Sequence, residues 1–253
     1  MAEEKKQSQY PSEMIDLPSK GKYYPEDSPL REGKLEIKYM TAREEDILTS
    51  QNLIKKGIVL DKVLDSLILT KGISSNDLLL GDKNAVMVAA RILAYGPEYE
   101  AEISNPNTGN KFKYKFNLAD CPFVKIDAKV DGNNFEVELP VSKKKITYKV
   151  LTGKEERAII EELKQLEKTG SQISRELTTR LRYSITSVDG DTNQSTINAL
   201  SNDMLARDSL FLREEMLKMA PDIDLRQKIE LEGDTVEVAI PMTVNFFWPG
   251  VKT

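Results

Sequence analysis

Two pairs of adjacent glutamates, beginning at Glu44 and at Glu155, are the residues of this chain whose types could carry acid–base chemistry. Two carboxylates can act as general acid and general base when they face one cleft and have different pKa values. Here each pair instead completes the frame Thr-x-x-Glu, as Thr41-x-x-Glu44 and Thr152-x-x-Glu155. In that spacing threonine and glutamate cap a helix start reciprocally, and negative charge suits the helix dipole. We therefore interpret these glutamates as the residues that start two helices.

A second candidate is the segment 105–110, NPNTGN, which has the outline of the zinc knuckle C-P-x-C-G. Asn105 and Thr108 stand where the cysteines would be, and Pro106 and Gly109 complete the frame. Zinc sites are built from thiolate, imidazole and carboxylate ligands, so neither residue is a zinc ligand. We interpret the segment as a turn with the shape of a degenerate knuckle, and we predict no metal and no cofactor.

The residues that the chain lacks also limit its chemistry. It contains no histidine and one cysteine, Cys121, so an internal disulfide is impossible. Without histidine there is no His-based general base and no Ser-His or Cys-His pair. A lone cysteine is most often a small buried hydrophobe. The sequence therefore predicts that the protein is not an enzyme.

The overall composition is that of an ordinary globular protein. The formal net charge is −5, which gives no reason to expect binding to nucleic acid. The chain has no apolar run near the ~18 residues that a membrane span needs. Its first ten residues, MAEEKKQSQY, lack the apolar core of a secretory signal. We expect partners other than membrane or nucleic acid.

The elements that must position these residues occur twice. In both copies, apolar and polar residues alternate as in a strand and are followed by the capping frame. The similarity continues upstream to a Leu-Pro pair and downstream to an apolar helix. Similarity of this kind between two long segments predicts a duplicated architecture. The matching segments are 34–46 with 145–157, 17–18 with 139–140, and 84–100 with 208–224.

From this pattern we predict an α+β fold of two duplicated units, each a strand, three helices and a β-hairpin, paired about a pseudo-twofold axis. The second unit should carry an insertion near residues 188–203. The expected parts are an N-terminal tail and extended arm (1–33), a first α+β repeat with the knuckle-like hairpin (34–120), a connecting β-hairpin (121–144) and a second α+β repeat with an aromatic C-terminal segment (145–253).

More local expectations follow from capping and turn residues. A helix should run from the first capping frame to Lys56, where Gly57 stops it. Further helices are expected over 58–69, 83–95, 152–168, 173–186, 195–202 and 205–219. Hairpins are expected for 98–104 with 110–117, 122–130 with 134–140, and 226–232 with 235–240.

Two aromatic clusters are candidates for partner binding. Phe246, Phe247 and Trp248 are adjacent, so the three rings cannot all face one side of a strand. Tyr23 and Tyr24 lie on the proline-rich arm. Aromatic residues are enriched both in cores and at the centres of protein interfaces. Core packing and contact with a partner therefore stay open for both clusters.

Long strings of the chain resemble the T4-like phage baseplate hub assembly protein family. They are IDLPSKGKYYPEDSPLREGKLEIKYMTAREEDILTSQNLIKKGIVLDKVLDSLI, LLLGDKNAVMVAARILAYG, YKVLTGKEER, TTRLRYSITSVDGD and VNFFWPG, and the resemblance covers about residues 14–249. It implies that many relatives carry a C-P-x-C pair in the hairpin at 105–109. This chain departs from that pattern at Asn105 and Thr108.

The resemblance implies a non-enzymatic structural or assembly protein of the baseplate hub of a contractile-tailed bacteriophage. Such a protein acts by binding other baseplate hub and tail proteins, in the virion tail baseplate and in the host cytoplasm during assembly, and homo-oligomerisation stays open. The alternative is a transient tail-assembly chaperone that is absent from the mature virion. An enzyme acting on cell wall or nucleic acid would need convergent carboxylates or a metal site, and the sequence indicates neither.

Overall fold

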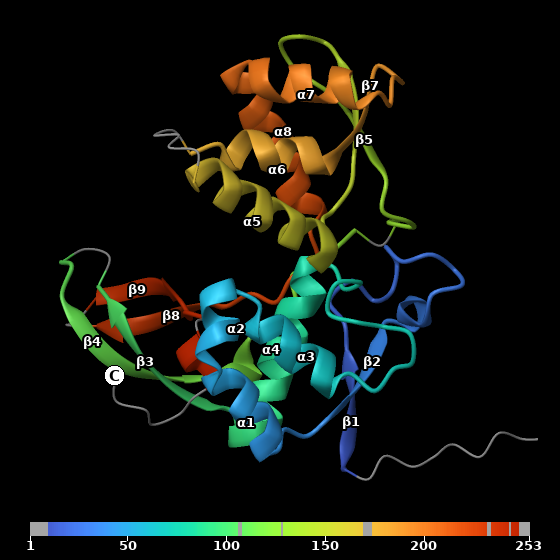
Figure 1. Ribbon diagram of the computed structural model, residues 1–253. Helices are drawn as coiled ribbons and strands as arrows, with labels where there is room; N and C mark the ends of the chain where they lie inside the picture. Colours follow the sequence, from blue (N-terminus) through green and yellow to red (C-terminus); the bar gives the residue numbers. More distant parts are fainter. Residues whose placement is uncertain are drawn as a thin grey trace, which may run out of the picture.

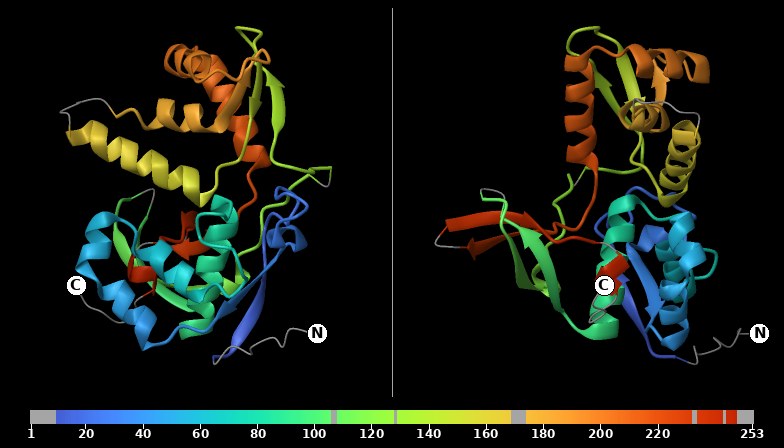
Figure 2. Two further views of the ribbon diagram at one scale, coloured as in Figure 1. Left: turned by 45° about the vertical axis from the view of Figure 1, so that its right-hand side comes forward. Right: turned by 60° about the vertical axis from the view of Figure 1, so that its left-hand side comes forward.

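The chain folds into two lobes, one above the other in Figure 1, that meet at a narrow junction. The computed structural model describes residues 10–105, 108–127, 129–168, 174–231, 234–242 and 244–247. Helices and small antiparallel sheets occur in both lobes, which confirms the predicted α+β class. Figure 2 shows the same two lobes from two further directions.

The first lobe opens with an antiparallel hairpin, in which β1 (Ser12–Asp16) pairs with β2 (Lys34–Lys38). The predicted helix up to Lys56 is divided at Ser50, whose backbone is extended. It ends at Gly57 as expected, because that residue has a φ of 72° and glycine adopts this left-handed conformation most readily. The four helices of this lobe are α1 (Ala42–Thr49), α2 (Gln51–Lys56), α3 (Val59–Leu67) and α4 (Leu80–Tyr95).

Two hairpins complete the first lobe and extend from it in Figure 2. In the first, β3 (Glu98–Ser104) pairs with β4 (Lys111–Asn117), which confirms the prediction to within one residue. In the second, β8 (Arg226–Leu231) pairs with β9 (Asp234–Ala239). Short 3-10 turns lie at Pro29–Glu32, Leu118–Asp120 and Val244–Phe247.

The second lobe is built on a three-stranded antiparallel sheet in the order β5-β6-β7. Its strands are β5 (Phe135–Glu138), β6 (Lys145–Tyr148) and β7 (Ile185–Val188). Its helices are α5 (Gly153–Lys168), α6 (Glu176–Ser184), α7 (Gln194–Asp203) and α8 (Ala206–Met219). The helix α7 and the strand β7 before it lie in or next to the segment where the sequence predicts an insertion.

Each lobe has its own hydrophobic core, and the two cores divide the chain unexpectedly. The first core contains residues from Leu17 to Cys121 and again from Ile223 to Phe247. The second contains residues from Leu139 to Leu212 only. The hairpin β8–β9 therefore packs with the first lobe, although the sequence places it in the predicted second repeat. The chain leaves the first lobe, builds the second and returns.

Two other predicted boundaries need correction. Residues 12–33 of the predicted arm are an integral part of the first lobe, because β1 pairs with β2 and Leu17 and Leu30 are buried in the first core. The connecting hairpin 121–144 pairs differently from the prediction, since β5 pairs with β6 across the turn that follows Leu139. Residues near Phe123 instead pair with the returning chain at Ile223. Local alternation could not reveal a partner one hundred residues away.

The capping frames give the two lobes a shared local geometry. In the first, the Lys38 ammonium lies 2.7 Å from a Glu44 carboxylate oxygen. In the second, Lys149 lies at the same distance from Glu155. Each glutamate also accepts the backbone N–H of its capping threonine at 2.9 Å. Duplication and the pseudo-twofold pairing of the units stay predictions, because local similarity and element order do not establish them.

Candidate partner-binding site at the lobe junction

The two capping glutamates are held as carboxylates by their neighbours. Burial alone would raise the pKa of Glu44, but hydrogen bonds from Lys38, Ser66 and Thr41 outweigh it and lower the pKa to about 2. For Glu155 the effect of burial is likewise outweighed, by Lys149 and Thr152, and the pKa is again about 2. Groups with such pKa values do not exchange protons near neutral pH, so both serve the helix starts.

The tyrosines of the N-terminal segment are core residues. Tyr23 is 3% exposed and Tyr24 is 6% exposed. The Tyr23 hydroxyl donates to the Met219 carbonyl at 2.6 Å, and the Tyr24 hydroxyl donates to Asp82 at 2.6 Å. Neither ring is available to a partner, so the core interpretation holds and the partner-binding prediction for this pair is wrong.

The C-terminal phenylalanines are buried as well. Phe246 and Phe247 are 1% and 2% exposed, and the Phe246 ring meets Tyr99 edge-on at 5.0 Å between centroids. The buried guanidinium of Arg91 donates through Nε to the Phe246 carbonyl at 2.9 Å. The partner-binding prediction is therefore wrong for both phenylalanines, and Trp248 lies outside the described residues.

The knuckle-like hairpin is a turn. Asn105 donates its backbone N–H to the Asn110 carbonyl at 2.8 Å, and Gly109 donates to the Asn105 carbonyl at 2.8 Å. The Thr108 N–H points to the Asn105 side-chain oxygen at 3.4 Å, and Pro106 lies outside the described residues. No group of potential metal ligands occurs in the part of the chain that the structure describes.

Cys121 is buried beside β8, where Gln227 Nε2 lies 3.5 Å from its sulfur. Burial raises the pKa of the Cys121 thiol. A raised pKa keeps the thiol protonated and unreactive. This environment agrees with the interpretation of Cys121 as a small core residue.

The junction between the lobes is a backbone contact made possible by two glycines. A Cβ atom on Gly81 of α4 would lie 1.7 Å from the Pro221 carbonyl oxygen, in the returning chain. A Cβ atom on Gly153, at the start of α5, would lie 2.4 Å from the Ser75 carbonyl oxygen. The Gly153 N–H also donates to the Leu78 carbonyl at 2.8 Å. The backbones of the two lobes therefore approach closely at these two glycines, with hollows beside the contact.

An apolar pocket of about 380 Å³ lies beside this contact, between α6, α8 and the start of α4. Two leucines at its edge are exposed, Leu177 of α6 by 44% and Leu217 of α8 by 75%. An exposed apolar surface of this kind, bordered by polar groups, marks an interaction site. Arg180 and Arg213 supply that border, while Leu151, Leu181, Met216 and Pro221 lie among the other lining residues.

The sequence predicts the helix at 205–219 but not which of its sides stays open. Within α8 the buried side chains are Asp208, Ser209 and Leu212. Leu210 and Leu217 are spaced seven residues apart, so they share a second side of the helix. That second apolar side is the one signal that could have identified the site, and it does not separate a core contact from a partner contact.

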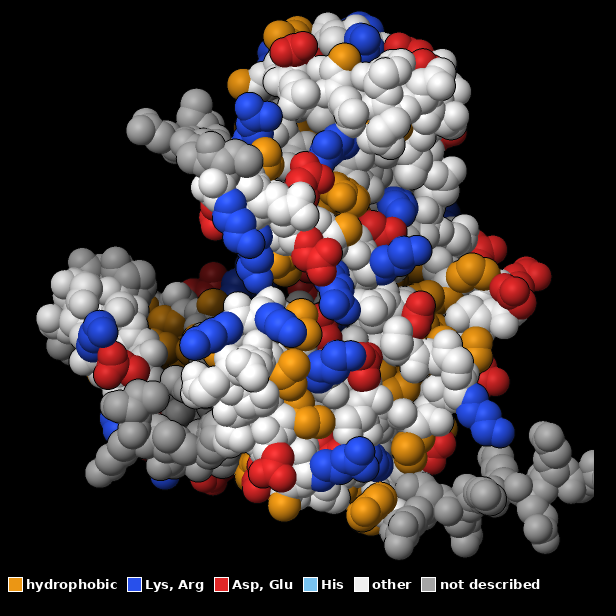
Figure 3. Space-filling view, viewed as in Figure 1, with side chains coloured by type: hydrophobic (Ala, Val, Ile, Leu, Met, Phe, Trp, Pro, Cys, Tyr) orange, Lys and Arg blue, Asp and Glu red, His pale blue; other side chains and the backbone are white. Residues whose placement is uncertain are grey.

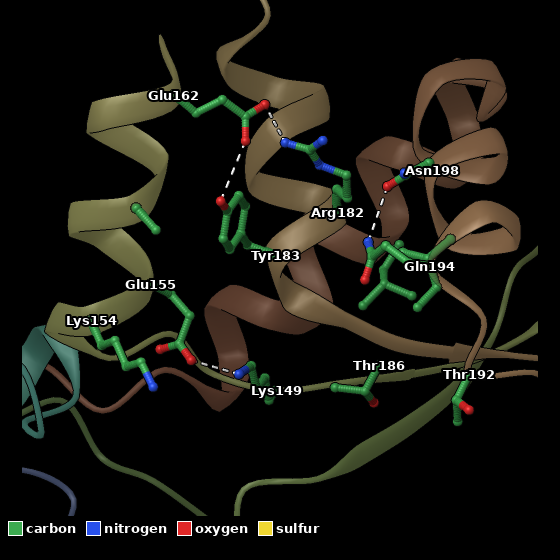
Figure 4. A pocket seen from close by; sticks show the side chains of 13 residues that line it. Lys149, Lys154, Glu155, Glu162, Arg182, Tyr183, Thr186, Thr192, Gln194 and Asn198 are labelled. Carbon is green, nitrogen blue, oxygen red and sulfur yellow. Dashed lines mark hydrogen bonds and ion pairs between the residues drawn. The ribbon is translucent and has the colours of Figure 1, made fainter. Parts of the chain in front are cut away.

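Another hollow, of about 590 Å³, is polar and lies within the second lobe (Figure 4). Its charged side chains are largely paired, Lys149 with Glu155 and Arg182 with Glu162. Gln194 donates to Asn198 at 3.0 Å on its far wall. These contacts satisfy the polar groups within the chain, so this hollow makes a weaker case for a partner than the apolar pocket.

A scan against models of protein families found no matching family, and searches of curated proteins and of solved structures found no similar chain. Among the described residues, no helix has both the length and the apolar character needed to cross a membrane.

Proposed function

We propose that this protein is a non-enzymatic structural or assembly protein of the baseplate hub of a contractile-tailed bacteriophage. It acts by binding other hub and tail proteins during tail assembly. The strings shared with the T4-like hub assembly family support the biological setting. The surface of the second lobe supports the mode of action.

The observation that carries the proposed mode of action is the exposure of Leu217 beside an apolar pocket. Leu217 is 75% exposed and Leu177 is 44% exposed at the edge of the same pocket. Burying a leucine side chain is worth about 1.5–3 kcal/mol, so two such residues and a pocket supply a small binding centre. A partner that covers both leucines would gain this energy on assembly.

The test is complementation of a phage that lacks the gene. We expect the wild-type chain to restore infectious particles and Leu217→Asp to fail, because a carboxylate in the covered pocket loses its water. Leu205→Asp is the matched control, since Leu205 is 50% exposed at the N-terminus of the same helix and does not line the pocket. Complete, infectious tails formed without any copy of the chain would overturn the proposal.

The alternative function is that of a transient chaperone, which shields apolar surfaces of tail proteins and leaves before the particle is complete. The exposed leucines suit either role. Mass spectrometry of purified particles separates the two, because a structural subunit is retained in the virion and a chaperone is absent. Copies of the chain at a fixed ratio to hub proteins would reject the chaperone.

A further inference from the structure

A second hollow of the junction, which we call the α5 groove, lies between α5 of the second lobe and the α2–α3 region of the first. It has a volume of about 430 Å³. Figure 3 shows Lys and Arg side chains gathered on both sides of the line where the lobes meet. The groove differs from the pocket at Leu217, which α6 and α8 border, and Leu80 is the lining residue that the two have in common among the described residues.

The charges of the α5 groove are unbalanced at one end. Its three carboxylates all have cation partners, Asp61 with Lys83, Glu156 with Arg180 and Glu161 with Arg157. Two further lining cations, Lys56 and Lys164, have no carboxylate partner among the described residues. This end of the groove therefore carries positive charge that no carboxylate of the described residues pairs with.

The Lys164 ammonium is held in place at this end. It donates to the Lys56 carbonyl at 3.0 Å, at the C-terminus of α2. An ammonium has three N–H donors, so two remain for a ligand. Lys168 follows one turn later on α5 and is also exposed, which extends the positive end along the helix.

Apart from Asn84 and two glycines, the remaining lining of the α5 groove is apolar. Ile54, Ile58, Met87 and Ile160 contribute to it, and Ile160 is 37% exposed. No aromatic side chain is found among its described lining residues. Single-stranded nucleic acid is usually bound by stacking bases on aromatic rings, and the chain as a whole is acidic. An aliphatic floor with a cationic end instead fits a helix that has one apolar and one acidic side.

We infer that the α5 groove binds an acidic amphipathic segment of a partner protein. The apolar side chains of that segment cover Ile160 and its neighbours, and its carboxylates meet Lys56 and Lys164. This surface is additional to the pocket at Leu217. The chain can thus contact two partners at once, one on each side of the junction.

The test uses the full-length chain and a fluorescent helical peptide with leucines on one side and glutamates on the other. Fluorescence anisotropy gives its dissociation constant. The double variant Lys56→Glu/Lys164→Glu should bind about tenfold more weakly, because two attractive contacts become repulsive. Lys228→Glu/Lys115→Glu is the matched control, since it changes net charge equally through exposed residues of β8 and β4. It should bind within about twofold of wild type.

Several outcomes would overturn the inference. In the first, the wild-type chain fails to bind the peptide in this assay. In the second, the Lys56→Glu/Lys164→Glu variant binds the peptide as tightly as wild type does. In the third, the control weakens binding as much as that variant does. Single-stranded DNA that binds as tightly as the peptide, and is indifferent to Ile160→Ser, would reject a protein partner. Matching thermal unfolding curves confirm that each variant is folded. Leu217→Asp leaves this groove intact, so this inference and the proposed function fail separately.

Discussion

Helices α4 and α8 are anchored alike at their N-termini but differ in what covers them. Each carries a buried aspartate in its first turn, Asp82 in α4 and Asp208 in α8. Each aspartate accepts a backbone N–H at 2.8 Å from the turn after the Leu-Pro pair, from Ser19 and from Val141 respectively. Up to this point the two helices are anchored in the same way.

The two helices differ further along, toward their C-terminal ends. Arg91 and Leu217 occupy the same position counted from the first residue of each helix, in a register two residues away from the sequence match of 84–100 with 208–224. Arg91 is 2% exposed and is bonded to the Phe246 carbonyl, whereas Leu217 is 75% exposed. The end of the chain returns to cover α4 and leaves α8 open. An open helix in an otherwise similar lobe is therefore the first place to look for a partner.

The largest loss of stability should come from disrupting the backbone contact between Gly81 of α4 and Pro221, which follows α8. Gly81→Ala places a methyl group 1.7 Å from the Pro221 carbonyl oxygen, where backbone must move. We expect a loss of more than about 3 kcal/mol of unfolding free energy. Gly153→Ala, at 2.4 Å from the Ser75 oxygen, should cost less. Denaturant unfolding measures both, and the reverse order would contradict this account of the junction.

Exchanging the residues at the corresponding position should separate stability from binding. Arg91→Leu removes donors from the carbonyls of Phe246, Gly96 and Glu98 and should cost about 3 kcal/mol. Leu217→Arg should change stability by less than about 0.5 kcal/mol, because the site is exposed. It should nevertheless abolish rescue of the deletion phage. Similar melting temperatures for Arg91→Leu and wild type would show that the returning chain end is not fastened by Arg91.

The capping glutamates sharpen the comparison through their different burial. The Glu44 side chain is fully buried and Glu155 is 18% exposed. Glu44→Gln should cost about 2 kcal/mol and Glu155→Gln about 1 kcal/mol at pH 7. Both folded pKa values lie at about 2, below the usual 4.5, so the stabilisation is present above pH 4.5 and is lost as pH falls toward 2. Unfolding curves across that range should converge for variants and wild type.

The smallest expected effect concerns the two aspartates, Asp82 and Asp208, whose contributions to stability should change with pH in opposite directions. Burial raises the pKa of Asp82, so its contribution is full below pH 3.8 and is lost as pH rises. For Asp208 the effect of burial is outweighed by N–H donors from Val141 and Ser142, and its pKa is lowered. Its contribution is therefore present above pH 3.8 and is lost in acid.

Asp208→Asn should then cost about 1 kcal/mol at pH 7 and little at pH 3, because asparagine can accept only one of the two N–H groups well. Asp82→Asn should compare with wild type more favourably at pH 7 than at pH 3. Unfolding measured at both pH values gives the two differences. If they had the same sign, the two sites would not be electrostatically distinct.

Local signals in the sequence are sufficient for much of this fold. The capping frame at Thr41, the glycine stop at Gly57 and the hairpin of β3 with β4 are each specified by neighbouring residues. The sequence pattern does not indicate strand β1, because prolines flank it and its partner, β2, lies beyond a long turn. Sequence pattern therefore located elements well when their partners were close in the chain.

The candidate site depends on choices that the local pattern does not contain. Phe246 and Phe247 carried the aromatic signal of an interface, but the first lobe uses them as core. Leu217 carried the weaker signal of one leucine on a helix, and it is the residue left exposed. The hairpin β8–β9 packs with the first lobe, so the phenylalanines that follow it are buried there and Leu217 stays exposed. That choice is a tertiary one, made across the whole length of the chain.

The return of the chain has a consequence for how the protein is made. The second lobe is continuous from β5 to α8, so a ribosome can complete its core before it reaches Ile223. The first lobe begins earlier in the chain, yet its core lacks the residues from Ile223 to Phe247 until the whole second lobe has been made. Domains usually fold in the order of their synthesis. In this protein we expect the later lobe to fold first, with the earlier one closing only when β8 and β9 emerge.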